Sequence, residues 1–191
     1  MTGEGHGMAV VGAGLVGSLT ALLLANRGHH VDVYERRQDP RKVGDATGRS
    51  INLALSERGW RALEKAGALE AVREIAMPVK ARCMHGLDGG LTYQPYGLPG
   101  KGRFGLDECI YSVARGPLNR ILLEAAEATG RVDVHFEHRL EDFSVSQDAV
   151  SLAFEDRSPL HHDRLFGTDG AFSAVRQRMM KGDRFDFSQS Y

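Results

Sequence analysis

The sequence predicts an α/β fold built on a mainly parallel sheet, and three observations support this prediction. An apolar run before Gly12 leads into helical apolar spacing over 15–28 and then into an alternating run over 30–35. Because the second connection is short, these pieces form one strand–helix–strand crossover with parallel strands. The spacing also predicts an amphipathic helix over 117–130. A further strand, glycine turn and helix are expected over 164–180.

The intervening segments show weaker but ordered patterns. In chain order we expect a polar loop over 36–48, a short buried segment over 51–55, a helix over 56–67 with Ser56 as its cap, a second short helix over 69–76, a hairpin formed by 79–87 and 91–97, a loop over 98–108 and alternating strands over 132–156. The hairpin turn is expected around Gly89 and Gly90. Residues 79–113 therefore predict a small β region beside the main sheet.

Composition places the chain among soluble globular proteins. Of its 191 residues 42% are hydrophobic and 26% charged, which is enough for one sizeable core. The net charge of −1 argues against nucleic acid as a partner. No apolar run is long enough to cross a bilayer, and the first residues lack the pattern of a signal peptide. A cytoplasmic protein without a membrane segment is expected.

Cysteine and histidine spacing predicts no metal site. The two cysteines, Cys83 and Cys109, form no CxxC pair. The eight histidines show no recognised ligand spacing. We therefore expect the pairs at 29–30 and 161–162 to be solvated side chains.

The motif at 12–17 carries the first functional signal. Gly12 allows a tight turn, Gly14 allows the backbone to approach a pyrophosphate, and Gly17 allows the helix to pack closely on the strand. The helix N-terminus supplies amides and a partial positive charge. Glu35 ends the next strand, where we expect an exposed acid that accepts hydrogen bonds from ribose hydroxyls. This context favours dinucleotide binding over a glycine-rich turn without a ligand.

A second glycine motif lies at 167–176. Asp169 and Gly170 follow a predicted strand and precede a helix, far along the chain from the first motif. The segment resembles the Asp-Gly motif of flavoprotein hydroxylases, which lies near both flavin and nicotinamide. The alternative is an ordinary Asp-Gly turn.

Seven segments together resemble the kynurenine 3-monooxygenase family of class A flavin hydroxylases. They are GRSINLALSERG from Gly48, ARCMH from Ala81, QPYG from Gln94, LNRILLEAAE from Leu118, HFEHRL from His135, DGAFSAVR from Asp169 and RFDFSQSY from Arg184. The resemblance covers almost the whole chain. It implies a Rossmann-like FAD-binding fold in which 1–191 is the FAD-binding domain and 79–113 begins a substrate-side β region. It also implies a longer enzyme, whose C-terminal half is absent from this sequence.

The resemblance also implies particular site residues. Flavin contacts are expected at Val16, Glu35, Arg36, Arg37, Arg49, Ala54, Arg115, Leu140 and Asp169. Arg82 and Tyr96 correspond to the pair that binds the substrate carboxylate, a role that suits a guanidinium fork and a phenol. The alternatives are a surface cation for Arg49 or Arg82 and core packing for Tyr96. No side chain is expected to be catalytic, because the flavin carries the redox chemistry.

The activity implied by the resemblance is hydroxylation of L-kynurenine, or a close relative, to 3-hydroxykynurenine. The cofactors would be bound FAD and transient NADPH, with molecular oxygen as co-substrate. Two alternatives stay open: another FAD-dependent oxidoreductase on the same scaffold, or an inactive nucleotide-binding fragment. Without the C-terminal half, we expect an exposed apolar face that promotes self-association.

Overall fold

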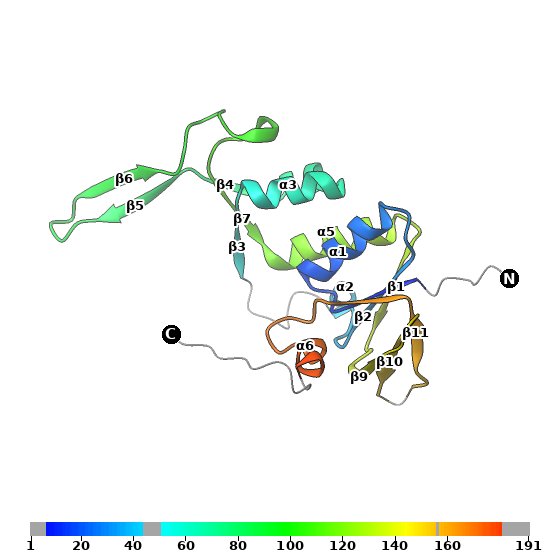
Figure 1. Ribbon diagram of the computed structural model, residues 1–191. Coiled ribbons are helices and arrows are strands. Elements are labelled where there is room, and N and C mark those ends of the chain that lie inside the picture. The colour runs from blue at the N-terminus through cyan, green and yellow to red at the C-terminus, as the bar shows by residue number, and fades with distance from the viewer. Residues whose placement is uncertain (1–6, 44–50, 156, 181–191) are drawn as a thin grey trace. The chain divides into compact units, whose positions relative to one another are not determined.

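The computed structural model describes residues 7–43, 51–155 and 157–180 and groups them into two compact units. Unit 1 takes its described residues from 7–43, 122–155 and 157–180, and unit 2 takes them from 51–121. The chain passes from unit 2 to unit 1 within helix α5 (Arg115–Glu127) (Figure 1). None of the helices in the described ranges is long and apolar enough to cross a membrane.

Unit 1 is built on a four-stranded sheet in which every strand runs parallel to its neighbours. The order is β12 (Arg164–Gly167), β1 (Met8–Val11), β2 (Val31–Glu35) and β8 (Val132–Phe136). The predicted parallel sheet and its strand–helix–strand crossover are confirmed. Since the strands are parallel, the segments that follow β1, β2 and β12 all leave the sheet at its carboxyl edge.

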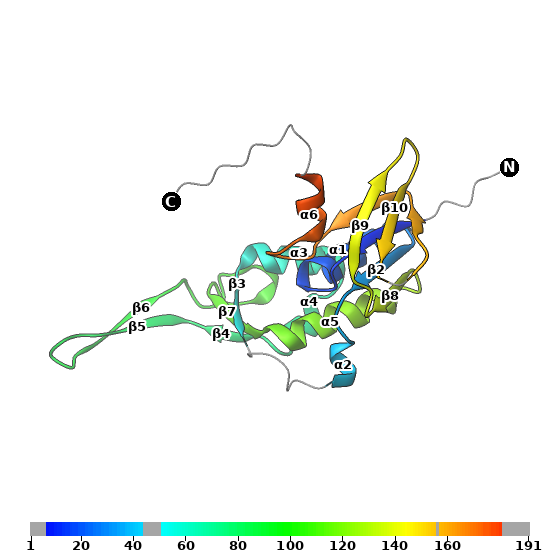
Figure 2. The ribbon, with the colours of Figure 1, turned by 90° about the horizontal axis from the view of Figure 1, so that it is seen from below.

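Different layers cover the two faces of this sheet (Figures 1 and 2). Helix α1 (Leu15–Ala25) packs on one face against β1, β2 and β8. On the other face lies an antiparallel sheet of order β11 (Leu160–His162), β10 (Val150–Phe154) and β9 (Leu140–Val145). The core between the sheets joins Ala9, Val11, Tyr34, Leu140, Val150, Leu152, Phe154 and Val175. Helix α6 (Ala174–Met179) packs against β9.

A polar cluster, partly buried, lies beside this core. The Tyr34 hydroxyl is hydrogen-bonded to Nε2 of His162 at 2.9 Å, and Asp32 Oδ1 lies 2.7 Å from Nε2 of His135. The Tyr34 ring stacks on His135 with centroids 5.0 Å apart. Burial and the nearby Asp32 charge raise the pKa of Tyr34 well above its usual range. His162 is only 4% exposed, so the prediction of a solvated pair is wrong for this residue.

Unit 2 is built on a three-stranded antiparallel sheet. Its order is β3 (Asn52–Leu55), β7 (Ile110–Ala114) and β4 (Met77–Val79). The predicted helices are confirmed as α3 (Glu57–Ala66), with Ser56 at its N-cap position, and α4 (Leu69–Arg73). Trp60 of α3 is buried and meets the Tyr111 ring edge-on, with centroids 5.2 Å apart.

Several local expectations differ from the structure. The segment 51–55 is not fully buried: Ile51 is 48% exposed, and exposed and half-buried side chains alternate along β3, as in a strand covered on one face only. The loop predicted over 36–48 contains a short helix, α2 (Pro40–Val43), and its residues 44–48 lie outside the described ranges. A 3-10 turn, η2 (Arg103–Gly105), interrupts the loop over 98–108. Strands β4, β7 and β11 were not predicted individually.

The predicted hairpin is confirmed as β5 (Ala81–His85) and β6 (Leu91–Pro95), an antiparallel pair. In both views it extends beyond the β3–β7–β4 sheet of the same unit (Figures 1 and 2). Its apolar side chains, among them Leu87, Leu91 and Tyr93, are exposed. A two-stranded hairpin is marginally stable on its own, so this element needs a partner surface.

The glycine turn before α1 is packed without room for side chains at two positions. Gly12 has φ +101° and lies against the segment that follows β12. A Cβ atom added at Gly17 would lie 1.8 Å from the Gly12 carbonyl oxygen, a contact that the backbone cannot tolerate. Gly14 differs, because an added Cβ would meet nothing within 4 Å.

This contrast predicts unequal effects of two alanine substitutions on the stability of the apo chain. Gly17→Ala should lower the free energy of unfolding by on the order of 3 kcal/mol, because backbone must move to admit the methyl group. Gly14→Ala should change it by less than about 1 kcal/mol. Urea unfolding of both variants measures the difference, and equal unfolding midpoints would contradict the packing described for Gly17.

Candidate functional site

The carboxyl edge of the unit 1 sheet presents an open helix N-terminus. Helix α1 begins at this edge, and its first-turn N–H groups have no acceptor inside the helix. Val16 is 65% exposed, and the space above Gly14 is open. Free amides, a partial positive charge and open space fit a pyrophosphate group. The predicted positions of Gly12, Gly14, Val16 and Gly17 therefore form a cradle that suits a dinucleotide.

Glu35 closes this cradle from the end of β2. Its Oε2 accepts a hydrogen bond from the Ala13 amide at 3.0 Å. Its Oε1 accepts from the amide of Arg37 at 3.0 Å and from the Arg37 side chain at 2.9 Å. Glu35 is 6% exposed, so the expectation of an exposed acid is wrong. A carboxylate accepts about four hydrogen bonds, which leaves capacity for a ribose hydroxyl.

The surroundings of Glu35 keep it ionised. Burial alone would raise the pKa of this carboxyl, but the hydrogen bonds and charge of Arg37, with the Ala13 amide, lower it below its ordinary value. Glu35 in turn raises the pKa of Arg37. The side chains of Arg36 and Arg37 lie at the surface beyond the strand, so both predicted contacts stand beside the cradle.

Asp169 helps to cap α6, whose N-cap residue is Ser173. Its Oδ1 accepts from the Ser173 hydroxyl at 2.5 Å, and its Oδ2 accepts from the Ala174 and Val175 amides at 2.6 and 3.2 Å. Sequence reasoning did not identify Thr168, the residue before Asp169, as a separate contributor to the glycine turn. The Thr168 hydroxyl lies 2.8 Å from the carbonyl oxygen of Val11 and 3.0 Å from that of Gly12. Its only signal in the sequence is its place directly before the Asp-Gly pair.

The connection between β8 and β9 also reaches this edge. The Glu137 amide donates to the Arg37 carbonyl at 3.1 Å, and the His138 amide donates to the Glu35 carbonyl at 2.9 Å. These bonds hold the connection that leads to Leu140. The Leu140 side chain itself is buried in the core between the two sheets.

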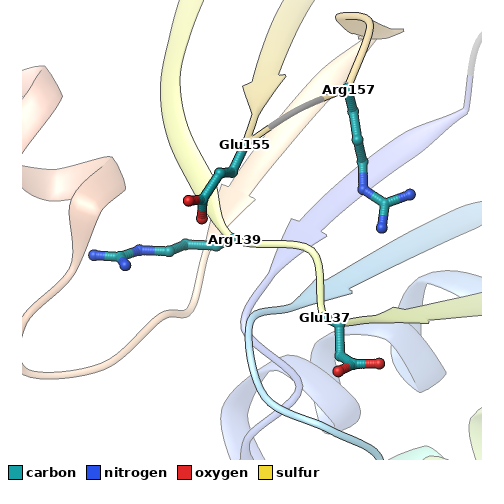
Figure 3. Close-up of a pocket in the computed structure, with 4 residues that line it drawn as sticks. All are labelled: Glu137, Arg139, Glu155 and Arg157. Atoms are coloured by element: carbon teal, nitrogen blue, oxygen red, sulfur yellow. The ribbon is translucent and has the colours of Figure 1, made fainter.

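A cavity of about 450 Å³ opens beside this connection. Four charged side chains line it, Glu137, Arg139, Glu155 and Arg157 (Figure 3). Sites for planar organic ligands are lined mainly by apolar and aromatic side chains. This cavity therefore does not suit the flavin ring or an aromatic substrate.

Within unit 2, two predicted flavin contacts lie on neighbouring elements. Ala54 pairs with Ser112 of β7, and the Arg115 amide, just beyond β7, donates to the Ile51 carbonyl at 3.0 Å. Both Ala54 and Arg115 are exposed. Arg49 lies outside the described residues.

The hairpin brings the predicted substrate pair onto one face. Arg82 lies opposite Gln94 in the register, and the Tyr96 amide donates to the Lys80 carbonyl at 3.0 Å. Side chains two residues apart on a strand point to the same side, so Arg82 and Tyr96 share a face. Arg82 is exposed and Tyr96 is 40% exposed, which excludes the core-packing alternative for Tyr96 within the described structure. A guanidinium and a phenol on one face can bind a carboxylate together.

The lowered pKa of Glu35 predicts acid sensitivity of the fold. An ionised Glu35 stabilises the folded state above the ordinary carboxyl pKa of 4.5, and this contribution is lost as pH falls through the lower pKa of the folded state. Glu35→Gln should therefore be about 1–2 kcal/mol less stable at pH 7 and less dependent on pH in the acid range. Urea unfolding between pH 7 and 3 measures this, with the exposed Glu141→Gln of the same unit as control. Parallel pH profiles for Glu35→Gln and wild type would refute the assignment.

The chain is similar in sequence to proteins named kynurenine 3-monooxygenase. It is 43% identical over 187 residues to that of Flavobacterium johnsoniae and 41% identical over 186 residues to that of Sus scrofa. Each alignment covers 96% of this chain, but only 40% and 38% of the respective relative. The chain thus spans about two fifths of the length of the curated relatives it matches. The resemblance predicted from the sequence is confirmed.

Solved structures and a family match agree on the fold. The p-nitrophenol 4-monooxygenase of Pseudomonas putida has a TM-score of 0.75 at 24% identity, over 91% of this chain and 43% of that one, which shows a shared fold. The predicted α/β fold is confirmed. The pattern of the FAD binding domain family matches residues 7–185. Since that match spans nearly the whole sequence, the chain belongs to the FAD binding domain family.

Proposed function

We propose that this chain is the FAD-binding part of an aromatic monooxygenase that converts L-kynurenine, or a close relative, to 3-hydroxykynurenine. NADPH would supply the electrons and molecular oxygen the inserted atom. The observation that carries the proposal is the cradle formed by the open α1 amides and Glu35. It occurs in a chain that is 43% identical to a kynurenine 3-monooxygenase.

FAD would lie along the carboxyl edge of the unit 1 sheet. The amides at the start of α1 would hold the pyrophosphate, and Glu35 would accept hydrogen bonds from ribose hydroxyls. The remaining contacts are those implied by the family, at Arg36, Arg37, Arg49, Ala54, Arg115, Leu140 and Asp169. When bound, FAD supplies the electron transfer and the oxygen activation that no side chain can provide.

The protein's own task toward the substrate would be orientation. The Arg82 guanidinium would form a charge-assisted pair with the substrate carboxylate, and the Tyr96 hydroxyl would donate a directed hydrogen bond to it. The aniline amine of kynurenine enriches the adjacent ring carbon in electrons, so no protein nucleophile is required. Fixing the amino-acid end of the substrate would then select the ring position that reacts.

A second candidate is a chain that binds nucleotide without catalysing hydroxylation on its own. The observation that favours it is the span of the alignment, which leaves about three fifths of the relatives unmatched. The exposed apolar side chains of the hairpin agree with it, because they lack a cover in the described structure. Another FAD-dependent oxidoreductase on the same scaffold is the third candidate.

Product analysis separates these candidates. The second candidate predicts that residues 1–191 mixed with FAD, NADPH and L-kynurenine bind FAD but form no measurable 3-hydroxykynurenine, because water would reach the reacting atoms. The same chain should self-associate in sedimentation measurements. A protein of the relatives' full length that contains this chain should form the product. Product formation by residues 1–191 at a rate near that of a full-length relative would contradict the need for the further part.

The outcome in the longer protein tests the reaction itself. NADPH oxidation that L-kynurenine stimulates, with 3-hydroxykynurenine formed in step, supports the monooxygenase. NADPH oxidation without hydroxylated product points to an oxidase or a reductase. Failure to bind FAD contradicts the cofactor assignment.

Arg82 offers a direct test of the substrate assignment. In that longer protein, Arg82→Met should raise the KM for kynurenine, through the loss of about 2–4 kcal/mol of binding from a charge-assisted contact. The affinity for FAD should stay near that of wild type. Arg58→Met removes an exposed cation from α3 of the same unit and should change neither quantity. If Arg82→Met released FAD and left the KM for kynurenine unchanged, Arg82 would be assigned to cofactor binding instead.

A further inference from the structure

The two glycine-containing segments of unit 1 lie against each other. Strand β12 pairs with β1 in parallel, and the Thr168 amide continues the ladder by donating to the Val11 carbonyl at 2.8 Å. An added Cβ at Gly12 would lie 2.7 Å from the Thr168 carbonyl oxygen and 2.8 Å from the Asp169 Cα. The segment after β12 therefore forms one wall of the glycine turn.

The Thr168 side chain reaches into this turn. Its hydroxyl lies 2.8 Å from the carbonyl oxygen of Val11 and 3.0 Å from that of Gly12, so its single proton is shared between these two acceptors. An added Cβ at Gly17 would meet the same hydroxyl oxygen at 2.7 Å. The hydroxyl thus lies between the turn and the first turn of α1.

The peptide group that joins Gly12 to Ala13 is held at both ends. Thr168 binds its carbonyl oxygen from the β12 side. Glu35 accepts its N–H at 3.0 Å from the β2 side. Gly12 has φ +101° and no side chain to limit its rotation. A flip of this peptide group would break both hydrogen bonds at once, so the two side chains fix its orientation.

We propose that Thr168 is a positioning residue for FAD: its hydroxyl locks the Gly12–Ala13 peptide group and so presets the glycine turn for the pyrophosphate. The inference rests on the proposed binding of FAD at this edge. Without the hydroxyl the turn would sample other orientations, and binding would have to select the competent one. Affinity would fall although no atom that contacts the cofactor is removed.

Three substitutions test this role in the 191-residue chain. Thr168→Val keeps the shape of the side chain but removes the hydroxyl, whereas Thr168→Ser keeps the hydroxyl. Thr129→Val is a matched control, because the Thr129 hydroxyl donates to the Ala126 carbonyl at 2.6 Å beyond the end of α5 in the same unit. FAD affinity is measured by flavin fluorescence, apo stability by urea unfolding, and exchange of the Ala13 amide by NMR.

Thr168→Val should weaken FAD binding about tenfold and speed exchange of the Ala13 amide, while Thr168→Ser should behave like wild type. Thr129→Val should leave FAD affinity and Ala13 exchange unchanged, even where it lowers stability equally. FAD affinity of Thr168→Val within twofold of wild type, or a loss matched by Thr129→Val, would overturn the proposal. If Thr168→Val does not fold, Thr168→Ala is assessed by the same criteria.

The design separates two kinds of failure. A wild-type chain that binds no FAD would contradict the cofactor assignment in the proposed function. The Ala13 amide would still report on the lock in the apo chain. Unchanged Ala13 exchange in Thr168→Val would refute the lock whether or not FAD binds.

Discussion

The orientation of the peptide group between Gly12 and Ala13 is the constraint on which the proposed FAD site depends. One strand lies on each side of β1, and each contributes a side chain to this group, Thr168 after β12 and Glu35 at the end of β2. The strand order β12–β1–β2 is therefore what allows the turn to be held from both directions. Helix α1 starts two residues later, so the direction of its free amides follows from this one orientation. Gly17 adds a third condition, since the helix can approach the turn this closely only without a side chain.

The two units differ in how well their own residues cover their apolar and charged side chains. In unit 1 the sheet is covered on both faces, and the negative charge of Glu35 is stabilised locally by Arg37 and by the Ala13 amide. In unit 2 the hairpin that carries Arg82 and Tyr96 has exposed apolar side chains. A carboxylate-binding pair gains strength only where water is excluded. The proposed FAD site thus rests on contacts within the chain, whereas the pair proposed to bind the substrate, Arg82 and Tyr96, is exposed in the described structure.

Local patterns predicted the elements, but they could not predict which side chains would be buried. The strand–turn–helix–strand unit and the hairpin follow from apolar periods of 3.6 and 2 residues and from glycine positions, which are properties of neighbouring residues. Burial of Glu35 depends on the Ala13 amide, 22 residues away, and burial of His162 depends on Tyr34, 128 residues away. The alternation of exposed and half-buried side chains along β3 depends on which of its faces is covered, and the apolar run over 51–55 does not reveal that. The functional role of 48–59 came from the resemblance alone.

The Asp-Gly segment shows why a motif can be both a structural turn and part of a cofactor site. The Asp169 carboxylate is engaged by the Ser173 hydroxyl and by two amides of α6, which is the work of a helix cap. By fixing α6, which packs against β9, Asp169 also fixes the backbone that walls Gly12. Thr168, one residue earlier, bonds to the glycine turn itself. The two interpretations of this motif are therefore compatible: as a turn, it packs against the first glycine motif, where we propose that FAD binds.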